Sequence, residues 1–166
     1  MKFLLFHFIN KQIMYGLNIN LQSFSIQPDL VGPSDDIRVS ITTVPDDNKQ
    51  AFVINVKKIS KANHVFTVNI TDATKKIIFV FRRKWFTHDD PIIASCVIHS
   101  EEFPKQDDAK NTEIKRFNLL EPLSRAKKFG YPNTFNKRMI FGEMRIQMTP
   151  VEALPVPLFE SYKKSN

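Results

Sequence analysis

The sequence predicts an all-β fold, an antiparallel sandwich or barrel built from eight short strands. Apolar residues recur at every second position from Met14 onward, and turn-forming residues interrupt this pattern every eight to twelve residues. No segment shows a long run with the 3.6-residue period of an amphipathic helix. The 166 residues suit one domain that buries a sizeable core.

The first four strands alternate between apolar and polar residues, so each is expected to bury one face. They are predicted over residues 17–26, 37–42, 52–56 and 66–70. A loop rich in Pro, Gly, Ser and Asp spans residues 28–36, and a turn spans residues 45–48.

The next two strands, residues 77–81 and 92–98, are apolar on both faces. Such strands lie deep in a sandwich, or they have an outer face that a tail or a partner covers. The sequence leaves these two alternatives open.

The last two strands are predicted over residues 114–120 and 139–148. A polar loop at residues 103–111 precedes them, and a long connection at residues 122–137, with one helical turn at 124–128, joins them. Prolines after residue 149 predict an extended tail. We therefore expect an apolar N-terminal extension at residues 1–13, a β-sandwich at 14–149 and a proline-containing tail at 150–166.

The N-terminal extension is apolar from Phe3 to Ile9, except for His7. This run is too short to span a bilayer, and no small-residue cleavage pattern appears before Tyr15. It is a strand or helix packed on the domain, a membrane-dipping segment, or a stretch upstream of a domain that opens at Met14. We expect a poorly ordered or loosely packed extension and no transmembrane segment.

Cys96 is the only cysteine, which favours a reducing compartment and therefore the cytoplasm. It lies inside an apolar run, so we expect it to pack in the core. His99 follows three residues later, and in a strand that offset points the imidazole to the opposite face. A catalytic Cys–His pair is therefore not expected.

The formal net charge of +7 favours anionic partners, namely lipid headgroups, an acidic protein surface or nucleic acid. Nucleic acid is the least favoured, because the aromatic residues lie beside aliphatic strand residues and do not form a stacking platform.

The order of these features resembles a divergent C2 domain over residues 15–149. Residues 17–21 resemble the opening strand of that family, and residues 29–36 resemble its first top loop, with Asp36 where proline is usual. Residues 78–93 are similar to the strand, third loop and strand that follow, and residues 142–148 to the last strand. The resemblance implies an eight-stranded antiparallel Greek-key β-sandwich.

Calcium-binding members of that family hold the ion with aspartates from the first and third loops. The vestigial candidates in this sequence are Asp29, Asp35, Asp89 and Asp90. Two of the third-loop acids of the family would fall near Arg82 and Lys84, and cations there repel a divalent ion. We therefore expect calcium independence, with no bound metal or other cofactor.

The third loop instead combines three cations with two large aromatic rings, which suits an anionic membrane surface or a protein hot spot. The predicted docking residues there are Arg82, Arg83, Lys84, Trp85 and Phe86. The resemblance implies a second patch on a basic strand face, a place where the family binds phosphoinositides or proteins. Its candidates are Lys57, Lys58 and Lys61.

The sequence therefore predicts a non-enzymatic binding module that docks on a protein partner or on anionic phospholipid. An enzyme is not expected, because the chain has no Gly-rich phosphate loop, nucleophile-elbow serine or metal-spaced Cys/His set. We expect it in the cytoplasm, at the periphery of a membrane or associated with the cytoskeleton. The alternative is a structural component of a cytoskeletal or ciliary assembly, which salt-resistant retention in a cytoskeletal pellet would support.

Overall fold

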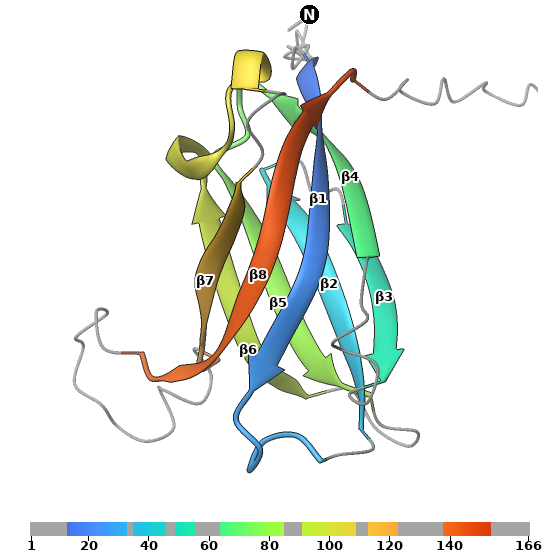
Figure 1. The fold of residues 1–166 in the computed structure, drawn as a ribbon, viewed down its shortest axis with the longest axis vertical. Coiled ribbons are helices and arrows are strands. Elements are labelled where there is room, and N and C mark those ends of the chain that lie inside the picture. The colour runs from blue at the N-terminus through green and yellow to red at the C-terminus, as the bar shows by residue number, and fades with distance from the viewer. Residues whose placement is uncertain are drawn as a thin grey trace, which may run out of the picture.

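Eight β-strands dominate the computed structural model of the chain, which describes residues 13–32, 35–45, 49–55, 64–84, 91–108, 113–122 and 138–153 (Figure 1). The strands are β1 (Ile13–Ile26), β2 (Asp36–Val44), β3 (Lys49–Asn55), β4 (His64–Thr71), β5 (Lys76–Arg83), β6 (Ile92–His99), β7 (Ile114–Leu120) and β8 (Ile140–Val151). Two short 3₁₀ turns, η2 (Ser100–Glu102) and η3 (Gln106–Asp108), lie between β6 and β7. The predicted eight strands are confirmed.

The strands form two antiparallel layers. Their hydrogen-bonded order is β3-β2-β5-β6-β7-β8-β1-β4, and β6 and β7 share one register pair, Ser95 with Leu120. The sheet therefore folds over at this seam, with β3-β2-β5-β6 in one layer and β7-β8-β1-β4 in the other. Because β2 pairs with β5 and β1 with β8, strands distant in sequence are neighbours, as in Greek-key sandwiches. The predicted antiparallel sandwich is confirmed.

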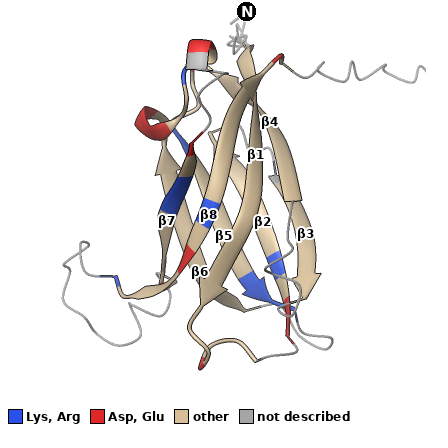
Figure 2. Ribbon diagram, in the orientation of Figure 1, with Lys and Arg blue, Asp and Glu red and all other residues tan. Residues whose placement is uncertain are grey.

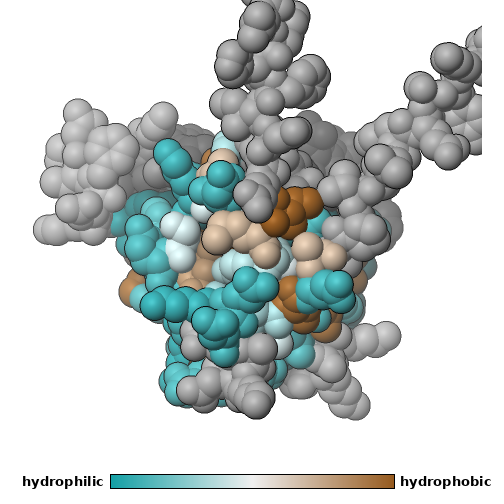
Figure 3. Space-filling view, turned by 90° about the horizontal axis from the view of Figure 1, so that it is seen from above, coloured by the Kyte–Doolittle hydropathy of each residue, from teal (hydrophilic) through white to brown (hydrophobic). Residues whose placement is uncertain are grey.

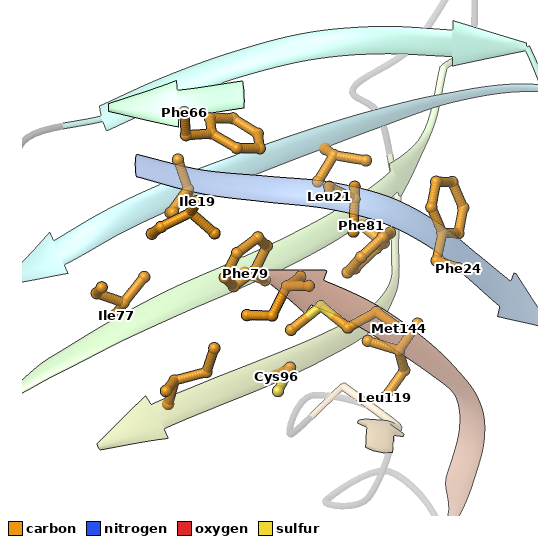
Figure 4. Close-up of a cluster of buried hydrophobic side chains, with 14 of the residues drawn as sticks. Ile19, Leu21, Phe24, Phe66, Ile77, Phe79, Phe81, Cys96, Leu119 and Met144 are labelled. Atoms are coloured by element: carbon orange, nitrogen blue, oxygen red, sulfur yellow. The ribbon is translucent and has the colours of Figure 1, made fainter. Parts of the chain in front are cut away.

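The core lies between the two layers and follows the period-two alternation of the strands (Figure 4). Leu17, Ile19 and Leu21 of β1 are fully buried, whereas the residues between them face outward. Across the layers, the ring of Phe24 lies 5.0 Å from that of Phe81, centroid to centroid. Such aromatic contacts add to the stabilisation that apolar burial provides.

The sequence leaves open whether β5 lies deep in the sandwich or has an outer face, and the structure shows an outer face. Ile77, Phe79 and Phe81 are fully buried between the layers, whereas Ile78 and Val80 point to the outer face and are partly exposed. The strand is therefore apolar on a face that lies outside the core.

The two ends of the sandwich carry different connections. At one end, which we call the loop tip, β1, β3, β5 and β7 end and β2, β6 and β8 begin. The opposite end holds η2, η3, the start of β1 and the end of β8. Seen from above, the described surface of this opposite end is mostly hydrophilic, with a few hydrophobic residues among the polar ones (Figure 3).

Across the residues that the structure describes, no helix has both the length and the apolar character needed to cross a bilayer.

Gly142 lies where the start of β8 pairs with the end of β1, opposite Ile26. A Cβ atom at this position would overlap the carbonyl oxygen of Ser25, which belongs to the backbone and cannot rotate away. We therefore expect Gly142→Ala to lower the free energy of unfolding by about 1–3 kcal/mol, measured by urea denaturation. Gly32→Ala is the control, because its Cβ would meet only the side-chain carboxylate of Asp35, at 3.3 Å. Equal losses in the two variants would contradict this explanation.

Candidate functional site

The three predicted cations of the third loop lie at the loop tip and not in the middle of the sheet (Figure 2). Arg82 and Arg83 are the last two residues of β5, and Lys84 follows directly. The backbone N–H of Arg83 donates to the Pro91 carbonyl at 3.1 Å, and that of Lys84 donates to the Asp36 carbonyl at 2.8 Å. These bonds fix the end of β5 to β2 and to the start of β6.

Arg83 binds the first loop. Its Nε atom lies 3.1 Å from Asp35 Oδ2, and its Nη2 atom donates a hydrogen bond to the Leu30 carbonyl. The contact with Asp35 is an ion pair without the alignment of a hydrogen bond. The same Oδ2 atom accepts the Gly32 N–H at 2.7 Å. Arg83 therefore joins β5 to two points of the first loop, Leu30 and Asp35, and Asp35 neutralises its charge.

The aspartates in and beside the first loop have different surroundings. Asp29 is exposed, and Asp35 is taken up by Arg83 and Gly32. Asp36, at the start of β2, accepts the Asn55 side-chain amide at 2.9 Å. Among the described residues, no three His, Cys, Asp or Glu side chains converge as a metal site would require.

Several of the predicted site residues lie outside the described residues. These are the third-loop residues Trp85, Phe86, Asp89 and Asp90 and the basic strand-face residues Lys57, Lys58 and Lys61. Their roles stay predictions. The helical turn expected at residues 124–128 lies outside the described part as well.

The structure adds apolar side chains to the loop tip that sequence reasoning missed. Met139 and Ile140 are 52% and 53% exposed, and Ile92 at the start of β6 is 39% exposed. Gln27 of the first loop donates to the Ile140 carbonyl at 3.2 Å through its side chain, so β8 begins against that loop. The signal was available, because Met139, Ile140 and Phe141 are consecutive and alternation lets only part of such a run face the core.

Buried polar contacts hold Met139 in place. Glu121 is 2% exposed, and its Oε1 atom accepts the Met139 N–H at 3.1 Å. Arg138 donates from Nε to the Glu121 carbonyl at 2.9 Å and from Nη2 to Ser95 Oγ at 3.0 Å. Burial lowers the pKa of the Arg138 guanidinium, while the charge of Glu121 acts in the opposite direction. The start of β8 is therefore tied to β6 and to the end of β7.

Cys96 is buried in the core, as expected from its sequence context. Burial raises the pKa of its thiol to about 12, and the charge of Glu102 acts in the same direction. His99 is exposed on the other face of β6. The thiol is therefore protonated at neutral pH and has no imidazole beside it on its own face of the strand.

An open pocket of about 310 Å³ lies at the opposite end of the sandwich, away from the predicted site. Its lining residues are Glu101, Glu102, Phe103, Pro104, Lys105, Glu113, Lys115 and Met148. Nearby, the Tyr15 hydroxyl donates to the Pro104 carbonyl at 3.0 Å, which anchors the η2–η3 segment to β1. The lining mixes acids with lysines, so it has no strong preference for one sign of charge.

No protein-family model and no curated protein sequence matches the chain. Solved structures do resemble it. A C2 domain of plant extended synaptotagmin 1 is 12% identical, with a TM-score of 0.60 over 87% of this chain and 100% of that domain. A structure of CC2D1B, described as coordinating ESCRT-III activity during mitotic reformation of the nuclear envelope, is 13% identical. Its TM-score is 0.53, over 81% of this chain and 54% of that chain.

These likenesses show that the chain has the C2 fold. The eight-stranded C2-like sandwich that the order of strands and loops predicts is confirmed. At 12% and 13% identity the likeness concerns the fold alone, so the function rests on the residues of this chain.

The contact between Arg83 and Asp35 is expected to stabilise the first loop. In a double-mutant cycle of Arg83→Gln and Asp35→Asn, we expect a coupling of about 1 kcal/mol from urea denaturation, because both side chains are partly buried. The matched control is the exposed pair Arg145 and Glu143, 3.5 Å apart, for which coupling close to zero is expected. A coupling for Arg83 and Asp35 no larger than that of the control would contradict the assignment.

The thiol of Cys96 is expected to be inert in the folded protein. With a pKa of about 12, about one thiol in ten thousand is ionised at pH 8. A chromogenic disulfide reagent should therefore react with less than one tenth of the native protein in an hour. In denaturant it should titrate one thiol within minutes, since an exposed thiol has a pKa of about 8.5. Fast reaction of the native protein would contradict the buried placement.

Proposed function

We propose that the chain is a non-enzymatic C2-like module that docks through its loop tip on an anionic surface without calcium. The observation that carries the proposal is the combination of cations and exposed apolar side chains at one end of the sandwich. Arg82 and Lys84 lie at the end of β5, and Ile92, Met139 and Ile140 are exposed at the starts of β6 and β8. We place the protein in the cytoplasm, at the periphery of a membrane.

An anionic membrane is the surface that this chemistry fits best. Cations attract the headgroup phosphates, each contributing on the order of 1 kcal/mol, and exposed apolar side chains gain by entering the interface. Arg82 and Lys84 then supply about 2 kcal/mol of attraction. Docking of this strength is weak and reversible, and it is sensitive to salt. An acidic protein surface is the other outcome that the same cations allow.

Calcium independence is supported by the position of Arg83. A calcium ion takes six to eight oxygen ligands, several of them carboxylates. At this tip the guanidinium of Arg83 lies against Asp35 and adds a positive charge there. The Asp35 oxygen nearest to it also accepts the Gly32 N–H. An ion placed there would meet a cation where it needs a carboxylate.

A binding role, and not catalysis, is supported by the state of the reactive groups. The Cys96 thiol is buried with a pKa of about 12, and the His64 ring stacks on Phe52 with ring centroids 4.0 Å apart. A nucleophile with an adjacent base is the arrangement that covalent catalysis requires.

Neutralising the tip cations should abolish docking. We expect the triple variant Arg82→Gln, Lys84→Gln and Trp85→Ala to lose at least nine tenths of its co-sedimentation with vesicles that contain phosphatidylserine. Wild-type binding should be equal in calcium and in a calcium chelator, and it should fall as salt rises. Arg83 is left intact, because it holds the first loop.

The control removes the same two charges from the outer face of the other layer, through Arg116→Gln and Arg145→Gln. This variant should bind the vesicles as the wild type does. The proposal fails if both variants lose binding equally, which indicates net charge alone, or if binding needs calcium. If the wild-type chain binds acidic proteins but not the vesicles, its partner is an acidic protein surface and not a membrane.

A further inference from the structure

The methionines that the structure describes fall into two classes by exposure. Met144 is fully buried and Met148 is 4% exposed, so both lie in the core. Met14 and Met139 are 55% and 52% exposed, so their side chains meet solvent. A thioether sulfur is a soft group that peroxides oxidise where they can reach it, so oxidation of the folded protein is expected first at Met14 and Met139.

The two exposed methionines lie at opposite ends of the sandwich. Met139 directly precedes β8 at the loop tip, beside the exposed Ile140. Met14 is the second residue of β1, at the end that holds η2 and η3 (Figure 1). Oxidation of Met139 therefore changes the proposed docking surface, whereas oxidation of Met14 leaves that surface as it is. The same chemical change at Met14 is thus a control within the chain.

The backbone of Met139 is fixed to a buried residue, and its side chain is left outside. The Met139 N–H donates to Glu121 Oε1 at 3.1 Å, and the Met139 carbonyl accepts the Glu121 N–H at 2.9 Å. Glu121 itself is 2% exposed. Both backbone polar groups of Met139 therefore bond inward, so the apolar thioether is the part of this residue that a docking surface meets.

We propose that Met139 is an oxidisable contact of the loop tip, and that a peroxide weakens docking on a membrane by converting its thioether to a sulfoxide. This role rests on the proposed docking function. In the step, the sulfur donates an electron pair to one oxygen of hydrogen peroxide, an S–O bond forms, the O–O bond breaks and the second oxygen leaves as water. A methionine sulfoxide reductase reverses the change, as two thiols are oxidised to a disulfide and the sulfoxide oxygen leaves as water.

The sulfoxide weakens docking because it puts a polar group where an apolar one enters the interface. The Met139 thioether gains by leaving water, as the exposed side chains of Ile92 and Ile140 do. A sulfoxide oxygen is a hydrogen-bond acceptor, and it loses its water partners when it enters apolar surroundings. The cations of the tip keep their charge, so we expect vesicle binding to weaken by about fivefold and not to vanish.

The test oxidises the full wild-type chain with hydrogen peroxide until about half of Met139 is sulfoxide, and then adds a limiting amount of phosphatidylserine vesicles. After sedimentation, peptide mapping by mass spectrometry measures the sulfoxide at each methionine in the bound and the unbound protein. The ratio of oxidised to unoxidised Met139 should be about fivefold higher in the unbound protein. The same ratio for Met14 should be equal in the two fractions. Equal ratios for Met139 would overturn the proposal.

Two variants complete the test. Met139→Leu keeps an apolar side chain that peroxide does not oxidise, and Met14→Leu is the matched control at the opposite end. Peroxide should weaken vesicle binding by the wild type and by Met14→Leu equally, a reductase should restore it, and Met139→Leu should bind equally before and after treatment. An equal loss in Met139→Leu would overturn the proposal.

The outcome also separates this role from the docking function. If the untreated wild type does not bind the vesicles, the docking proposal fails and the role of Met139 fails with it. If the untreated chain binds and a fully oxidised Met139 leaves binding unchanged, the docking proposal stands and only the role of Met139 is overturned.

Discussion

The guanidinium of Arg83 is the contact on which the arrangement of the loop tip depends. It reaches from the end of β5 to Asp35 and to the Leu30 carbonyl, so the first loop, which connects the two layers, is held to β5. A charged side chain thereby performs a structural task at the loop tip. This contact supports the proposal that the first loop is ordered without calcium. Arg82 and Lys84 lie beside it at the end of β5 and are the proposed contacts with an anionic surface.

The strand β5 links the core with the loop tip. Its odd-numbered residues from Ile77 to Phe81 fill the space between the layers, and its even-numbered residues from Ile78 to Arg82 form the outer face. Such a strand is apolar on both faces although only one of them lines the core. Arg82 stands where the outer face of β5 reaches the loop tip.

Much of the fold could be predicted from sequence, because strand alternation is a local signal. The run from Leu17 to Leu21 shows its buried face by period alone, and the burial of Cys96 follows from its apolar neighbours. The contact of Arg83 with Asp35 could not be predicted, because it joins residues far apart in the chain whose positions depend on the whole topology. For the same reason, the sequence could not tell whether Val80 lies deep in the sandwich or on an outer face.

Calcium binding by the wild-type protein tests the central claim most directly, since the claim is that Arg83, and not a calcium ion, holds the first loop through Asp35. The measurement is a calorimetric titration of the full chain with calcium at low ionic strength, with magnesium as the reference. We expect heats of dilution only, and an unchanged melting temperature at millimolar calcium. Saturable binding with a sub-millimolar dissociation constant, accompanied by a rise in melting temperature, would contradict the claim.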